Sequence, residues 1–80
     1  MTGAQRITPR QCRAARGLLR WTVRKLAEES GVTFRTIVDF ENEKRLPINA
    51  TLQALQAAFE RGGVEFIWAN GGGPGLREKR

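Results

Sequence analysis

Apolar side chains recur every three or four positions along most of this chain, the spacing of helices that bury one face. The first such stretch spans residues 9–19. Further stretches with this spacing predict helices over 23–30, over 34–42, and from Asn49 or Ala50 to Arg61. Pro47 separates the last two, because proline interrupts a helix. The pattern therefore predicts a mainly helical domain.

The spacing of apolar residues changes after residue 63. Every second residue is then apolar, at Val64, Phe66 and Trp68, so 64–68 is predicted to be a strand. We expect a turn over 70–75 and a second strand over 76–79. Because an isolated hairpin is only marginally stable in water, it must pack on the helices or pair with another chain.

The first predicted helix has a complete start signal. Thr8 suits the N-cap, Pro9 suits the first helical position, and Gln11 can bond back to the Thr8 amide as a capping box. Ile7 and Cys12 are spaced to pack on each other as a hydrophobic staple. This gives the single cysteine of the chain a structural role.

Residues 22–46 carry the strongest functional signal. They predict two short amphipathic helices, capped by Thr22 and Thr33 and joined by a tight turn at Ser30-Gly31-Val32. This arrangement is typical of a helix-turn-helix, which places its second helix in the major groove of DNA.

Composition and charge agree with that interpretation. Eighty residues, 40% of them apolar, suffice for one small core. We place a helix-turn-helix domain at 1–63, and a strand or hairpin with a flexible basic tail at 64–80. The net charge of +6 favours a polyanionic partner. Residues 1–46 hold ten Lys/Arg against five Asp/Glu, so most of the excess lies in the half with the motif.

Several other function classes are disfavoured. The chain has no histidine and one cysteine, so we expect no metal site, cofactor, internal disulfide or enzyme activity. The GGGPG segment at 71–75 lacks the Lys-Ser/Thr of a phosphate-binding loop. The sequence shows no membrane span, signal-like segment or small-molecule site. A lone cysteine fits a reducing cytoplasm.

The run LAEESGVTFRTIVDFEN at 26–42, with Pro47 and TLQAL at 51–55, resembles the Cro/CI-type helix-turn-helix regulators. Ala27, Gly31, Ile37 and Glu41 fall at the positions of that family's pattern. The resemblance implies a lambda-repressor-like fold of four helices, here with the short C-terminal strand or hairpin. It also implies a homodimer that binds double-stranded DNA at two half-sites.

The resemblance places four residues against DNA bases: Phe34, Arg35, Thr36 and Asp39. Arg35 can bond guanine at two atoms, and Thr36 can bond a base or a phosphate. Asp39 could accept from cytosine or pair with Arg35 along the helix. Phe34 could meet a thymine methyl or pack on the Thr22 end of the preceding helix.

Other residues are expected to act at the DNA backbone or within the domain. The phosphate contacts would come from Thr22, Arg24, Thr33, Asn42, Lys44 and Arg45. Any one of these could instead be an ordinary solvated side chain. The resemblance further implies an ion pair between Arg16 and Glu41.

Two residues depart from the family's pattern. Arg20 and Glu43 stand where glycine is frequent, at the ends of the first and third helices. We therefore expect a positive φ at Arg20 or Glu43. The Glu43 carboxylate would also repel DNA phosphates.

These observations favour a sequence-specific regulator, most simply a repressor. The alternative is a protein-interaction module, or an antitoxin-like partner, with weak or no DNA binding. The sequence leaves the dimer contact open. Strand 64–68 could pair with its copy in a second chain, or pack on the helices of its own chain.

Overall fold

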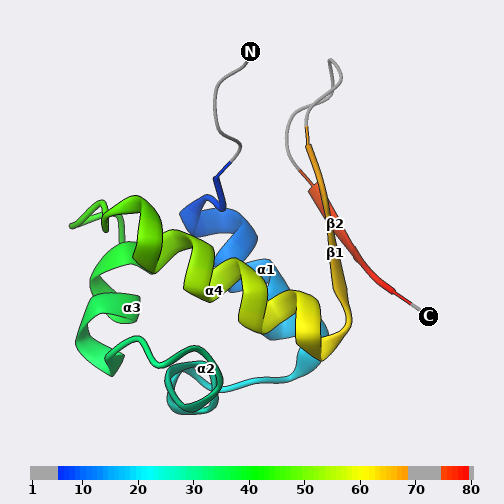
Figure 1. The fold of residues 1–80 in the computed structure, drawn as a ribbon, viewed down its shortest axis with the longest axis horizontal. Helices are drawn as coiled ribbons and strands as arrows, with labels where there is room; N and C mark the ends of the chain where they lie inside the picture. Colours follow the sequence, from blue (N-terminus) through cyan, green and yellow to red (C-terminus); the bar gives the residue numbers. More distant parts are fainter. Residues whose placement is uncertain (1–5, 69–74, 80) are drawn as a thin grey trace.

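The computed structural model describes residues 6–68 and 75–79 of the chain. Four helices surround one core, and an antiparallel hairpin covers its side (Figure 1). The elements are α1 Pro9–Leu19, α2 Val23–Ser30, α3 Phe34–Glu41, α4 Asn49–Gly62, β1 Val64–Ile67 and β2 Gly75–Glu78. The predicted mainly helical fold with a C-terminal hairpin is confirmed.

The predicted helix boundaries are close to the observed ones. Helix α1 agrees at both ends, and α4 continues to Gly62. Helix α3 ends at Glu41, because Asn42 has a φ of −89° and a ψ of 6° and so leaves helical geometry. The predicted end at residue 42 is therefore wrong by one residue.

A threonine is the N-cap of each of the first three helices. Thr8, Thr22 and Thr33 each accept a hydrogen bond from the amide three residues later. The Thr8 amide donates a hydrogen bond of 3.0 Å to Gln11 Oε1, which completes the predicted capping box. These local bonds satisfy amides that a helix start would otherwise leave unpaired, and so fix where each helix begins.

The hairpin belongs to the same core as the helices. Val64 and Phe66 of β1 are buried with residues from every helix. An aromatic row joins the elements, with ring centroids 5.8 Å apart for Trp21–Phe59, 6.2 Å for Phe59–Phe66 and 5.7 Å for Phe66–Trp68. The hairpin therefore packs on its own chain, which is one of the two expected arrangements.

The hairpin register places Val64 opposite Glu78 and Phe66 opposite Leu76. β1 ends at Ile67, one residue before the predicted end, and β2 runs one residue earlier than predicted. Gly75, expected in the turn, is the first residue of β2, and the rest of the expected turn lies outside the described residues. The buried Gln11 side chain donates to the Gly75 carbonyl at 3.2 Å and fixes β2 to α1.

Among the residues that the structure describes, the backbone is left-handed at two residues other than glycine. Arg20 has a φ of 59° and Glu43 a φ of 61°. The expectation of a positive φ at one of them is confirmed at both. Each lies just after a helix, where glycine would adopt the same angles without steric cost.

Candidate nucleic-acid interface

A hydrogen-bonded turn fixes the angle between α2 and α3. The Ser30 hydroxyl donates to the Leu26 carbonyl at 2.7 Å and accepts from the Val32 amide at 3.1 Å. Gly31 supplies a φ of 76°, and Val32 is buried in the core. The turn therefore anchors one end of α3 while the outer face of that helix stays open to solvent.

The first turn of α3 projects from the domain. The Arg35 side chain is 83% exposed, so neither the core nor the described part of the C-terminal segment covers it. Its Nε lies 3.4 Å from Asp39 Oδ2, and the expected intrahelical pair is present. Arg35 is thus an exposed cation on the protruding face, held weakly by one neighbour.

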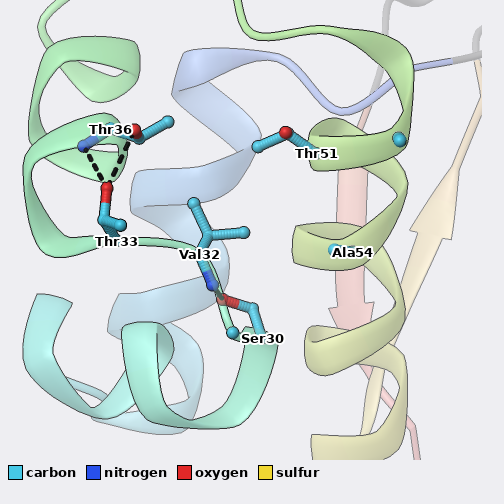
Figure 2. Close-up of a pocket in the computed structure, with 8 residues that line it drawn as sticks. Ser30, Val32, Thr33, Thr36, Thr51 and Ala54 are labelled. Atoms are coloured by element: carbon cyan, nitrogen blue, oxygen red, sulfur yellow. Dashed lines mark hydrogen bonds between the residues drawn. The ribbon is translucent and has the colours of Figure 1, made fainter.

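Thr33 and Thr36 form a small hydroxyl pair at the start of α3 (Figure 2). Thr33 Oγ1 accepts from the Thr36 amide at 3.3 Å and donates to Thr36 Oγ1 at 2.9 Å. The hydroxyl hydrogen of Thr36 is not used in this pair. It is therefore available to an acceptor on a base or a phosphate.

A shallow hollow of about 350 Å³ lies beside this hydroxyl pair. The turn and Thr36 form one side, and Thr51 and Ala54 of α4 lie on the other (Figure 2). Its walls carry no charged side chain. The hollow therefore gives uncharged open space beside the first turn of α3.

Phe34 lies against the first turn of α2. The guanidinium carbon of Arg24 is 5.6 Å from the centroid of the Phe34 ring, which is cation–π distance. The Phe34 residue is nevertheless 49% exposed. The ring thus packs partly on α2, as one of the two expectations had it, and keeps apolar surface open to solvent.

The residues expected at the DNA backbone flank this surface. Thr22 and Arg24 lie at the start of α2, and Thr33 lies at the start of α3. Asn42, Lys44 and Arg45 follow the other end of α3, and all three are exposed. Within residues 6–68 and 75–79, Lys44 and Arg45 form no ion pair with an acidic side chain.

Arg16 and Glu41 connect α1 to the end of α3. Arg16 Nε donates to Glu41 Oε2 and Arg16 Nη2 to Glu41 Oε1, each at 2.8 Å. The Glu41 side chain is only 6% exposed. The hydrogen bond to Glu41 raises the pKa of the Arg16 guanidinium. The pair that the family pattern implied thus has bidentate geometry.

Two further residues bind Glu41. The Cys12 thiol donates to Glu41 Oε2 at 3.1 Å, and Arg13 Nη1 donates to the Glu41 carbonyl. Burial, and then the hydrogen bond to Glu41, raise the pKa of the Cys12 thiol above its ordinary value of 9.0. The thiol is therefore a protonated donor that helps to hold the carboxylate.

Sequence reasoning missed these contacts and the cation–π contact between Arg24 and Phe34. In each case the partners lie on different helices, so no spacing within one helix could reveal them. Cys12 was assigned to the hydrophobic staple, and it is indeed buried in the core with Ile7. The exposed apolar residue at the start of a capped helix, Phe34, was the one visible sign of an unusual surface.

Comparison with known proteins agrees with this geometry. A family model described as helix-turn-helix matches residues 13–66. A search of curated proteins returns no match to the chain. In the described ranges, no helix has the length and apolar character to cross a membrane, and no three His, Cys, Asp or Glu side chains gather as a metal site.

Proposed function

Because this chain belongs to the Cro/CI-type helix-turn-helix family of DNA-binding regulators, we propose that it is a sequence-specific repressor that reads the major groove with α3. The observation that supports this most directly is the open first turn of α3. There, Arg35 projects into solvent beside the available Thr36 hydroxyl. Cations flank both ends of the same helix.

In the proposed complex, Phe34, Arg35, Thr36 and Asp39 face the bases. The Arg35 guanidinium donates to guanine O6 and N7, a pairing worth about 1–3 kcal/mol of discrimination. Thr36 donates its free hydroxyl hydrogen. The exposed Arg35–Asp39 pair costs only about 0.3–0.5 kcal/mol to break. Guanine therefore competes successfully for the arginine.

The phosphates are held on both sides of α3. Thr22, Arg24 and Thr33 contact one strand, together with the amides at the positive end of α2. Asn42, Lys44 and Arg45 contact the other. Glu43 stands among the second group, and its negative charge opposes these contacts. Because Arg24, Lys44 and Arg45 neutralise phosphates, affinity should fall as the salt concentration rises.

We further propose that the protein acts as a homodimer in the cytoplasm. Helix α3 has eight residues, a length of about 12 Å, so one copy reads only a few base pairs. Two copies on half-sites about 34 Å apart would read a site long enough for specificity. A dimer seated across a promoter would block transcription by occupancy.

Random-site selection followed by mobility shift of the full chain tests the DNA-binding proposal. We expect one enriched site with twofold symmetry. A dissociation constant weaker than about 10⁻⁴ M for every sequence at low salt would refute it. Sedimentation with and without the selected site tests the dimer. Truncation after Gly63 is unsuitable for that test, because it removes Val64 and Phe66 from the core.

A second candidate, a protein-interaction module, is favoured by the loop between α3 and α4. Leu46 is 72% exposed and Ile48 is 73% exposed, an unusual pair of apolar side chains in solvent. Amide chemical shifts during titration with the selected DNA separate the two candidates. Shifts at Phe34–Asp39 support DNA reading, whereas their absence supports the interaction module.

A further inference from the structure

We propose that Arg24 and Phe34 form one unit that recognises thymine, in which Arg24 is a positioning residue for the Phe34 ring. This inference rests on the proposed DNA-binding function and adds a specificity element to it. The ring would contact the 5-methyl group of one thymine in each half-site. The guanidinium, in cation–π contact with the ring, would hold the ring in place and bond an adjacent phosphate.

The contact between the two side chains is selective. Arg24 has a carboxylate one turn along α2, at Glu28, yet within the described residues it forms no ion pair. The neighbouring Lys25 does pair along the helix, with Glu29 at 3.0 Å. Arg24 instead lies over the Phe34 ring, 5.6 Å from its centroid.

The chemistry of Phe34 determines which base it can recognise. A phenyl ring has no hydrogen-bond donor or acceptor, so it reads a base edge only through an apolar contact. In the major groove of unmodified DNA, thymine alone presents an apolar group, its methyl. Phe34 is the first residue of α3 and is 49% exposed, so part of its ring is open to such a contact.

Arg24 contributes to thymine recognition indirectly, by holding the Phe34 ring. A guanidinium in cation–π contact with an aromatic ring still has N–H donors available for a phosphate. One side chain can therefore anchor the DNA backbone and restrict the rotation of Phe34 at the same time. The methyl contact should then weaken when Arg24 is removed, although Arg24 itself does not touch the methyl.

The test replaces each thymine of the selected site by deoxyuridine, which lacks only the methyl. For the full-length wild type we expect one position per half-site at which deoxyuridine weakens binding about fourfold. This factor corresponds to the free energy of burying one methyl group. Phe34→Ala should abolish this difference, and Arg24→Ala should reduce it substantially. Lys25→Ala is the matched control, since it also removes one charge from α2 but should retain the full difference.

Three results would overturn the inference while leaving the proposed function intact. In the first, the wild type binds equally well with deoxyuridine at every position. In the second, Phe34→Ala still loses affinity when the thymine methyl is removed. In the third, Arg24→Ala loses as much affinity from that removal as the wild type does. Thermal unfolding of each variant checks that these exposed substitutions leave the fold in place. If the wild type selects no sequence at all, the proposed function itself fails.

Discussion

The Glu41 carboxylate accepts two bonds of 2.8 Å from Arg16, and this pair holds the end of α3 against α1. Cys12 and Arg13 add bonds to the same residue from the same helix. Helix α3 is thus anchored at its beginning by the buried Val32 and at its end by Glu41. The exposed side chains between these anchors, such as Arg35, can therefore face outward without loosening the helix.

Replacing Arg16 by methionine should destabilise the fold markedly. The substitution leaves the Glu41 carboxylate buried without its partner, a loss of about 3 kcal/mol. This lies at the lower end of values for buried pairs, because the Arg16 side chain retains 23% exposure. Urea unfolding followed by circular dichroism measures the change.

The exposed pair Lys25–Glu29 provides the comparison for Arg16. Lys25→Met removes an ion pair of similar length from the surface of α2 and should cost under about 1 kcal/mol. The double variant Arg16→Met/Glu41→Leu should lose less stability than Arg16→Met and Glu41→Leu lose together, since it leaves no unpaired buried charge. Equal costs for Arg16→Met and Lys25→Met would show that the buried pair has no special role.

Cys12 should make stability depend on pH in the alkaline range. The pKa of its thiol is raised in the folded state above the ordinary 9.0, so the unfolded chain loses this proton first. Above pH 9.0 the unfolded state then binds fewer protons than the folded state, and the free energy of unfolding falls. The maximum slope is about 1.4 kcal/mol per pH unit for one group.

Urea unfolding of wild type and Cys12→Ala, on both sides of pH 9.0, measures this effect. Both proteins contain the same lysines, so the difference between their slopes reports the thiol alone. Parallel pH profiles would contradict the prediction. The buried thiol should also react with a maleimide only at the rate of unfolding, whereas the unfolded chain should react at once.

The left-handed angles at Arg20 and Glu43 predict two stabilising substitutions. Arg20→Gly and Glu43→Gly should each raise stability by about 1 kcal/mol, because glycine adopts a positive φ without steric cost. Glu43→Gly should also strengthen DNA binding, since it removes a negative charge beside the proposed phosphate contacts. Gln53→Gly is the control, because it places glycine at an exposed position within α4. It should lower stability by about 1 kcal/mol.

The two glycines inside helices should respond oppositely to alanine. At Gly17 an added Cβ would meet no atom within 4 Å, so Gly17→Ala should stabilise α1 by roughly 0.5–1 kcal/mol. At Gly62 an added Cβ would lie 2.7 Å from Cζ2 of Trp21 and 2.9 Å from Cδ1 of Leu19. Gly62→Ala should therefore lower the melting temperature, and an increase there would contradict the packing around Trp21.

These results show which parts of the structure depend on local sequence. Thr8, Thr22 and Thr33 bond to amides three residues away, so their helix starts could be predicted from spacing alone. The contacts that hold the end of α3 could not be predicted from spacing, because Glu41 bonds to α1, far away along the chain. The family resemblance alone implied its pair with Arg16. The positive φ at Arg20 and Glu43 could be predicted only through the family's glycine positions.

The candidate interface divides in the same way. The outward positions of Arg35 and Asp39 follow from the helical period, and their pairing follows from a spacing of four residues. The cation–π contact between Arg24 and Phe34 depends on the angle at which α2 meets α3. The hydrogen-bonded turn and the burial of Val32 set that angle. The spacing of residues along the sequence cannot predict this angle.

Arg35 should determine one base of the selected site. Arg35→Ala should lose about 1–3 kcal/mol of discrimination at a single guanine position, measured by competition among all four bases there. Arg35→Lys keeps the charge but not the planar pair of donors. It should therefore preserve the salt dependence of binding while losing most of the discrimination.

Asp39 provides the complementary test of how Arg35 is held. Asp39→Ala removes the partner 3.4 Å from Arg35, and it removes one negative charge from the proposed DNA-binding face. Binding to all sequences should strengthen, because that charge opposes the phosphates. The guanine preference should persist, since the exposed pair contributes at most about 0.5 kcal/mol against 1–3 for the bidentate contact. If the preference disappears instead, Asp39 orients Arg35 for reading, and the ion pair belongs to the recognition surface itself.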